Sequence, residues 1–420
     1  MHIAKQKPLI GAGLLSALLA AGQMVPAQTS TPFSFQPEWR IRHDGSQANA
    51  PSIGSTSAPQ EWLSRLRLGF AWHDSSGLSL FVQPQHRESE QLVGSHWRVQ
   101  SVAELYQGYV EKRYGPWSVR VGRQILAYGV HRLLDDDNWN NISRSFDAIR
   151  LRYERRGAST DLFVGRVGVA DGKPIRPVLT GLYSTLTLGP QNTTDLYLLY
   201  VHDHEAGNNF GLWTMGTRPV VHLLGRIEAS VETAFQFGSN GSKAVTAWAY
   251  GATLNTRFPG KAGLRLLLER DFASGGSPTD PHHTNTFDPL FGSSHAFFGS
   301  LIYANWRNVR QWRVMLSGAP IRRWELSVDT HFLALADARD YWYAGGPVKG
   351  VNGLPLRSPN GTAGREIGTD VDLIATYHLS RTLSLEMGYS HFFPGHFIRT
   401  LAPTLAHEVN WFYLQPTWRF

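Results

Sequence analysis

The chain ends with the stretch Trp411-Phe412-Tyr413-Leu414-Gln415-Pro416-Thr417-Trp418-Arg419-Phe420. Its even positions carry apolar Phe412, Leu414, Trp418 and Phe420, while polar Gln415, Thr417 and Arg419 occupy odd positions. A period of two predicts a β-strand with one apolar and one polar face. A final strand that ends on phenylalanine is typical of bacterial outer-membrane β-barrels, so we expect further strands with one apolar and one polar face along the chain.

The N-terminus indicates export from the cytoplasm. Lys5 and Lys7 precede an apolar and small-residue segment at 9–22, and Val25-Pro26-Ala27 offers a small-residue cleavage site. This arrangement predicts a secretory signal peptide, too short to span a membrane as a helix. We therefore expect a signal peptide at residues 1–27 and a single outer-membrane β-barrel domain at residues 28–420.

The composition excludes several classes of protein. The 420 residues include no cysteine, so disulfides, thiolate chemistry and cysteine-ligated metals are impossible. No apolar run of about 18 residues follows the signal segment, which excludes helical membrane spans. The formal charge of +7 falls to +5 when Lys5 and Lys7 are removed. This mild excess suits anionic partners, and we expect neither a nucleic-acid partner nor a cofactor.

Alternation with a period of two recurs along the chain. The clearest case is segment 225–237, where Ile227, Val231 and Phe235 alternate with polar residues. A soluble β-sandwich would bury such apolar faces, whereas a membrane barrel turns them toward lipid. The pattern predicts 18 antiparallel strands, at 33–42, 62–73, 78–86, 101–113, 117–124, 144–154, 159–168, 181–188, 194–203, 211–218, 224–237, 245–257, 262–272, 312–318, 324–334, 368–379, 382–390 and 409–420.

The connections between these strands alternate in length. Those after even-numbered strands are short, with turn cores at 74–77, 115–116, 156–158, 259–261, 322–323 and 380–381. Those after odd-numbered strands are mostly long, including 43–61, 125–143, 273–311, 335–367 and 391–408. Short periplasmic turns and long extracellular loops are the arrangement of outer-membrane barrels. A barrel of this size encloses an aqueous lumen.

The polar faces of the first strands are rich in arginine. Arg65, Arg67, Arg120, Arg150 and Arg152 all lie on predicted inward faces. A guanidinium binds both oxygens of a carboxylate, so a track of arginines would favour polyanions. Alternatively, these charges pair across the lumen with acids of later strands as structural ladders.

Three segments carry a resemblance to a known family. They are Gly122-Arg123-Gln124-Ile125-Leu126-Ala127-Tyr128-Gly129, the loop residues Asn138-Trp139-Asn140-Asn141, and the strand Arg144-Ser145-Phe146-Asp147-Ala148-Ile149-Arg150-Leu151-Arg152-Tyr153. They resemble the alginate-export family of outer-membrane barrels. Segments 286–299 and 388–395 are similar to this family as well, and the resemblance extends from about residue 60 to residue 420.

The resemblance implies an 18-stranded channel with an arginine-rich constriction that is gated by loops and exports alginate, a polyuronate. At the positions that match the family's motifs, the resemblance implies that Arg123, Arg144, Arg150 and Arg152 line this constriction. Alternation along the strand places Arg123 on the same face as Val119 and Val121, which points toward lipid. Its side chain would therefore reach the lumen only at the rim of the barrel or beyond a β-bulge.

Other candidate sites carry weaker signals. Asp135-Asp136-Asp137 lacks the spacing of a calcium loop and reads as a solvated acidic segment. Adjacent His282 and His283 would point apart, so we expect no metal site. Tryptophans near strand ends, such as Trp117, Trp306 and Trp312, are expected at the membrane interfaces.

These features leave three functions to compare. The first is passive conduction of an anionic, alginate-like polysaccharide, with periplasmic export proteins as possible partners. The second is a porin for uptake of small anions, such as organic acids or oligosaccharides. The third is an outer-membrane lipase, but no motif singles out a catalytic serine, so we expect no enzyme and no catalytic residues.

Overall fold

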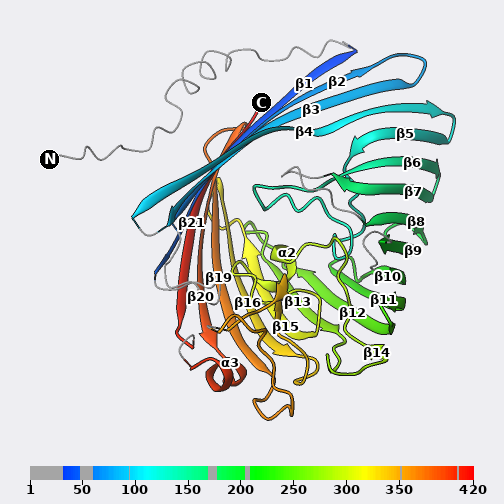
Figure 1. Cartoon of the computed structure of the whole chain (residues 1–420). Coiled ribbons are helices and arrows are strands. Elements are labelled where there is room, and N and C mark those ends of the chain that lie inside the picture. The colour runs from blue at the N-terminus through cyan, green and yellow to red at the C-terminus, as the bar shows by residue number, and fades with distance from the viewer. Residues whose placement is uncertain are drawn as a thin grey trace.

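The structure is a computed structural model that describes residues 32–47, 60–93, 95–168, 177–203, 209–350, 352–403 and 406–420. The predicted signal peptide lies outside these residues. In the described part of the chain, eighteen long strands form one closed antiparallel barrel (Figure 1). This confirms the predicted fold class and all 18 predicted strands. The strands are β1 (Phe33–Gln47), β2 (Glu61–His73), β3 (Leu78–Val93), β4 (His96–Tyr114), β5 (Trp117–Gln124), β6 (Ser145–Arg155), β7 (Ala158–Gly168), β8 (Val178–Thr187), β9 (Thr193–Asp203), β10 (Phe210–Leu223), β11 (Ile227–Asn240), β12 (Lys243–Arg257), β13 (Arg265–Ala273), β15 (Val309–Gly318), β16 (Trp324–Leu335), β19 (Glu366–His378), β20 (Leu383–Pro394) and β21 (Val409–Arg419).

The C-terminal strand closes the cylinder. β21 pairs with β20 on one side and with β1 on the other, and both pairings are antiparallel. At the closing seam, the rings of Trp39 and Trp418 stack with centroids 5.0 Å apart, and Arg419 pairs with Glu38 at 2.9 Å. The C-terminal stretch, which was predicted to be the last strand, therefore closes the barrel, and the described barrel sheet has no free edge.

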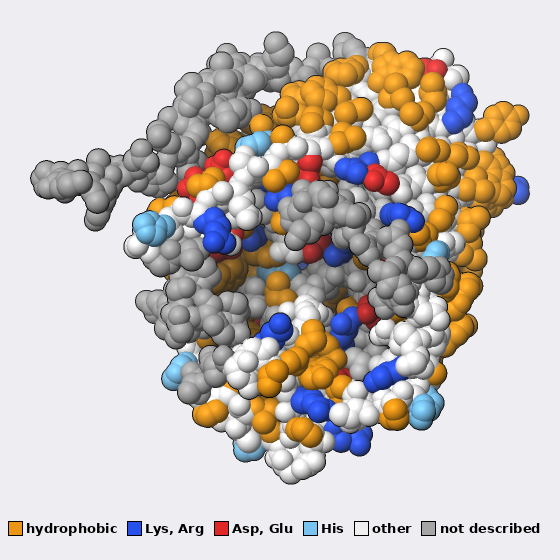
Figure 2. Space-filling model, in the orientation of Figure 1, with side chains coloured by type: hydrophobic (Ala, Val, Ile, Leu, Met, Phe, Trp, Pro, Cys, Tyr) orange, Lys and Arg blue, Asp and Glu red, His pale blue; other side chains and the backbone are white. Residues whose placement is uncertain are grey.

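The two faces of each strand meet different surroundings. In β11, the outward side chains of Val231, Phe235 and Phe237 are 42–54% exposed, while inward Glu232 and Gln236 are 6% and 2% exposed. Figure 2 shows the same division, with hydrophobic side chains over the outer wall and charged ones around the central hollow. This apolar outside and polar inside is the inverse of a soluble fold and suits a barrel in lipid.

The connections follow the predicted alternation. One end of the barrel carries short turns, and the other carries long loops at 125–144, 274–308 and 336–365. The long loops hold the small elements β14 (His283–Thr284), α2 (His295–Phe298), β17 (Tyr343–Ala344) and β18 (Gly346–Pro347), and α3 (His396–Leu401) follows β20. No helix in the described ranges is long and apolar enough to cross a membrane.

One proline within a strand, Pro84, lies where the ladder is interrupted. Pro84 lies inside β3, and the register between β3 and β4 shifts between Gln83 and Pro84. Because proline has no N–H to donate, a bulge at this point removes the need for one ladder bond.

The prediction for the tryptophans is only partly right. Trp312 and Trp117 lie on the outer wall and are 57% and 46% exposed. Trp306, in contrast, is 2% exposed and packs against the ring of Phe287 within the 274–308 loop. Its position in the sequence, shortly before β15, could not reveal that this loop turns inward.

The outer wall generates a stability prediction. Replacing outward Val164, near the middle of β7, with arginine should lower the free energy of unfolding from lipid vesicles by about 2–4 kcal/mol. Arginine at inward Asn255, which lies 3.4 Å from the Glu228 carboxylate, should have a much smaller effect. Urea unfolding in vesicles measures both values, and equal losses would contradict the assigned faces.

Candidate functional site

The 125–144 loop folds into the barrel and narrows the lumen. Its side chains Leu126 and Leu134 are each 1% exposed and belong to an apolar cluster that includes Phe146 and Phe298. Leu134 also forms a parallel bridge with Phe291 of the 274–308 loop. α2, which belongs to that second loop, lies inside the barrel outline in Figure 1. Burial of these apolar side chains stabilises both loops within the lumen.

A stack of rings also connects the two loops. Trp139 lies face to face with His295, with centroids 3.8 Å apart and planes 7° apart. Burial lowers the pKa of His295 to about 3, so its ring is neutral at neutral pH. A neutral imidazole can pack against an indole beside nearby arginines without adding positive charge.

Arginines of the first strands hold the 125–144 loop by its backbone. Arg40 of β1 donates to the carbonyl oxygens of Asn138 and Asn140, at 2.7 and 3.1 Å. Arg65 of β2 donates to the same two carbonyls at 3.1 Å, and to Glu38 at 3.1 Å. Arg65 is 1% exposed, so its guanidinium is an anchor for the loop.

Arg42 and Arg67 extend the same set. Arg42 donates to the carbonyl of Trp139 at 2.9 Å and lies 4.3 Å from the centre of its ring. Arg67 donates to the side-chain oxygen of Asn138 at 2.9 Å and lies over the Tyr106 ring. Most oxygens that these arginines bind in the loop are therefore neutral. We call Arg40, Arg42, Arg65 and Arg67 the basic wall.

The arginines of β5 and β6 have mainly carboxylate partners. Arg120 pairs with Glu111, and Arg150 lies 3.7 Å from Glu111 and 4.0 Å from Asp161. Arg152 binds Asp161 through two hydrogen bonds of 2.7 and 2.9 Å. All three arginines face the lumen, and the alternative of paired charges describes their contacts.

Arg123 does not face the lumen, although the family resemblance implied that it lines the constriction. It shares the outer face of β5 with Val119 and Val121, and it binds Asp147 through bonds of 2.7 and 2.8 Å. The alternation of side chains along the strand therefore predicted the side correctly, and Arg123 lies on the outer wall near the loop end of β5.

Arg144 connects the two inner loops. Its guanidinium donates to the carbonyl of Asp135 at 3.1 Å and to the carbonyl of Phe291. The side chain also lies 5.7 Å from the centre of the Phe291 ring. Burial lowers the pKa of Arg144, with nearby Asp137 opposing that effect. Arg144 therefore joins protein segments in this structure.

The lumen side of β11, β13, β16 and β19 is acidic. Arg313 of β15 lies within this acidic region, where it pairs with Glu269 at 3.0 Å and with Asp329 at 2.6 Å. The buried acids, which we call the acidic wall, are Glu232, Glu269, Asp271, Asp329, Asp370 and Asp372.

Arg132 carries a positive charge from the 125–144 loop to the acidic wall. It is 3% exposed, pairs with Glu269, and lies 2.9 Å from Asp271. Gly251 of β12 leaves the necessary space, because a Cβ there would come within 2.7 Å of the guanidinium carbon. The loop is thus held from both sides, by arginines of one wall and carboxylates of the other.

The acidic run of this loop is not solvated, so that expectation was wrong. Asp135 is 5% exposed, and Asp136 accepts a hydrogen bond from Tyr106 at 3.0 Å. Burial raises the pKa of Asp136, and neighbouring Asp135 raises it further. The hydrogen bond to Asp135 raises the pKa of His131. Within the described ranges, no group of three or more His, Cys, Asp or Glu could hold a metal ion.

Three important arginines were not predicted. Arg40 and Arg42 alternate in a strand that was predicted correctly, so extending the parity argument to segment 33–42 would have found them. Arg132 lies in a loop, where no sequence period indicates which way a side chain points.

Comparisons with known proteins agree with this geometry. OccK2 (OpdF) of Pseudomonas aeruginosa, solved in complex with glucuronate, has a TM-score of 0.65 at 11% identity; the alignment covers 92% of this chain and 98% of that one. OccK7 (OpdD) of the same organism gives 0.62 at 12% identity, with 92% and 98% covered. OccAB4 of Acinetobacter baumannii gives 0.60 at 9% identity, with 94% and 100% covered. At these low identities, the TM-scores show a shared fold alone.

Sequence comparison identifies the family. No curated protein sequence matches the chain. The family described as alginate export matches residues 32–412, which includes nearly the whole barrel. The chain therefore belongs to the alginate export family, and it is a channel-type β-barrel of the bacterial outer membrane.

Proposed function

We propose that the barrel conducts carboxylate-bearing sugars passively, and that an anionic, alginate-like polyuronate is its main substrate. The observation that supports this most is the basic wall, where Arg40 and Arg67 bind mainly neutral oxygens of the 125–144 loop, and Arg42 binds a carbonyl of this loop in addition to Asp44. A uronate carboxylate is a stronger partner for a guanidinium than a carbonyl or an amide oxygen. The substrate would therefore compete with the loop for the same arginines.

This competition supplies a means of opening. As a carboxylate binds Arg40 or Arg67, the loop loses hydrogen bonds to that wall, and its remaining hold on the lumen weakens. Each exchange replaces one hydrogen bond of an arginine with another, so its net free energy is only about 1 kcal/mol. Weak, repeated sites let a polymer advance without being trapped.

Arg120, Arg150 and Arg152 serve a different part of the path in this proposal. Because Glu111 and Asp161 neutralise much of their charge, they would bias selectivity over a distance, without binding substrate tightly. Outward Arg123 has no role in conduction here, and Arg144 acts on the loops. No step of conduction requires a bond to be broken, so the proposal includes no catalytic residue.

The second candidate is uptake of small anions such as monomeric uronates. It is favoured by the packing of the 125–144 and 274–308 loops across the lumen, since a narrow path admits a monomer with less rearrangement than a polymer. The solved neighbour OccK2 contains glucuronate, which is a monomer of this class.

Substrate length separates the two candidates. If polymer export is correct, uronate oligomers should block the current through single channels in planar bilayers more strongly than monomers at equal carboxylate concentration, because several sugars bind the wall at once. Neutral oligosaccharides of equal length are the control. Equal block by monomers and oligomers would favour uptake of small anions, and equal block by neutral sugars would contradict both candidates.

Charge reversal tests the role in selectivity. Arg150→Glu or Arg152→Glu should lower the anion-to-cation permeability ratio roughly 15-fold. Each unit of charge about 10 Å from the path in water changes an ion's energy by roughly 0.4 kcal/mol, the substitution changes the charge by two units, and the effect has opposite signs for anions and cations. Reversal potentials in a salt gradient measure the ratio. Arg322→Glu in a short turn is the control. Unchanged ratios in both lumen variants would count against the proposal.

Loop release is tested separately. In Arg40→Gln with Arg67→Gln, the 125–144 loop loses hydrogen bonds that water replaces in part, so open probability should rise about tenfold, equivalent to about 1.4 kcal/mol. Arg120→Gln with Arg152→Gln removes the same charge from arginines whose partners are Glu111 and Asp161, and it should leave gating unchanged. Equal gating in both double variants would show that the loop is held by other contacts.

A further inference from the structure

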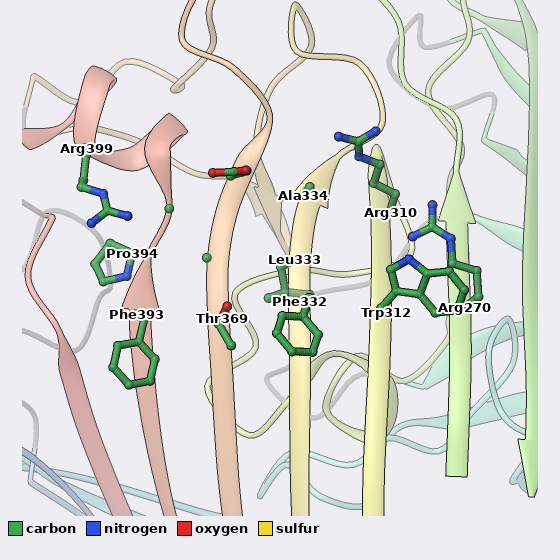
Figure 3. Close-up of a pocket in the computed structure, with 13 residues that line it drawn as sticks. Arg270, Arg310, Trp312, Phe332, Leu333, Ala334, Thr369, Phe393, Pro394 and Arg399 are labelled. Atoms are coloured by element: carbon green, nitrogen blue, oxygen red, sulfur yellow. The ribbon is translucent and has the colours of Figure 1, made fainter.

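A cleft of about 560 Å³ lies on the outer wall at the loop end of β13, β15, β16, β19 and β20. Figure 3 shows Phe393, Thr369, Phe332 and Trp312 in a row across β20, β19, β16 and β15, with the charged ends of Arg399, Arg310 and Arg270 on the loop side of that row. The cleft therefore combines an apolar floor with a cationic upper edge.

Strand register places this cleft on the lipid side of the barrel. Trp312 pairs across the ladder with Arg270 and Phe332, and these positions alternate with inward Gln311, which is 0% exposed. The rings of Trp312, Phe332 and Phe393 are 57%, 50% and 45% exposed. Because hydrocarbon surrounds this face in a membrane, the rings would contact acyl chains, and the arginines would lie at the headgroup level.

The arginines of the cleft differ from those of the lumen in their partners. Arg270 donates to the carbonyl of Gln311 at 3.0 Å and lies 5.0 Å from the Trp312 ring centre. Among the described residues, no carboxylate forms an ion pair within 4.0 Å of Arg270, Arg310 or Arg399, although Glu366 also lines the cleft. Three guanidinium groups therefore lie on the loop side of the cleft, and Glu366 is the one acid among the residues that line it.

A cationic edge with three arginines and one acid, above an aromatic floor, matches one kind of occupant. Arginine binds phosphate through paired hydrogen bonds, and basic clusters at a membrane surface recognise anionic lipid headgroups. The cleft lies on the side of the long loops, which is the extracellular side of an outer-membrane barrel. The lipid of that leaflet in bacteria is lipopolysaccharide, whose lipid A part carries phosphate groups beside its acyl chains.

We propose that this cleft is a binding site for lipid A, with one of its phosphates on Arg270 and Arg310, the other on Arg399, and an acyl chain along Trp312, Phe332 and Phe393. The site is separate from the lumen, so it stands or falls independently of the transported substrate. It would fix the barrel's depth in the outer leaflet at the strands that carry the 274–308 loop.

The experiment titrates lipid A against the purified full-length barrel in detergent and counts bound lipid by native mass spectrometry. In Arg270→Gln with Arg310→Gln and Arg399→Gln, affinity for bisphosphorylated lipid A should fall at least about tenfold, since charge-assisted bonds to phosphate are lost. The matched control replaces three arginines at the opposite rim, Arg155, Arg156 and Arg322, with glutamine, and it should bind as the wild type does.

Two further arms identify the ligand group. Lipid A with its phosphates removed and its acyl chains intact should bind the wild type as weakly as the triple variant binds the bisphosphorylated form. Inorganic phosphate alone, at the same concentration as the lipid, should not displace lipid A. Single-channel conductance of the triple variant should match that of the wild type, which checks the fold; if the triple variant fails to fold, Arg310→Gln and Arg399→Gln are measured singly.

Several outcomes would overturn the proposal. Equal binding of phosphorylated and dephosphorylated lipid A would remove the role of the arginines. Equal losses in the cleft variant and in the opposite-rim control would indicate a general charge effect. Displacement of lipid A by inorganic phosphate would identify an anion site with no preference for lipid.

Discussion

The backbone of this barrel has no water to bind on its outer side, and that constraint governs the rest of the structure. An unpaired N–H or C=O costs several kcal/mol in hydrocarbon, so each spanning strand needs two neighbours. The pairing of β1 with β21 meets this requirement at the seam. Once the ladder is closed, the period of two assigns alternate side chains to lipid and to the lumen. The apolar outer wall and the charged interior are both consequences of that closure.

A charged interior then creates a second problem, which the inner loops answer. Arginines gathered on β1 and β2 repel one another unless oxygens lie between them. The 125–144 loop supplies backbone and amide oxygens to Arg40, Arg65 and Arg67, and its Arg132 contacts the carboxylates of the acidic wall. The loop is therefore an electrostatic bridge across the lumen. Because its partners on the basic wall are the groups that would attract an anionic sugar, conduction and loop position are linked in the proposed function.

The sequence predicted the features that follow from periodicity and missed those that depend on long-range contacts. Alternation and loop lengths were enough for 18 strands, and parity placed Arg65, Arg67, Arg120, Arg150 and Arg152 on the inward face. Parity was also right about Arg123, where family resemblance suggested the lumen. The inward turn of the loops could not be foreseen, because it depends on contacts between distant segments, such as Leu134 with Phe291. For that reason Trp306 was assigned to the membrane interface, and Asp135 to solvent.

The absence of native cysteine makes the central claim directly measurable. Single cysteines at successive positions 231–236 of β11 would be tested in outer-membrane vesicles with a small, charged, membrane-impermeant thiol reagent. A hydrated lumen inside a lipid-facing wall predicts labelling at inward positions 232, 234 and 236 after mild denaturant loosens the loops, and protection at outward 231, 233 and 235 while the strands stay paired. Labelling without alternation, or protection of the even positions only, would contradict a closed barrel with water inside and hydrocarbon outside.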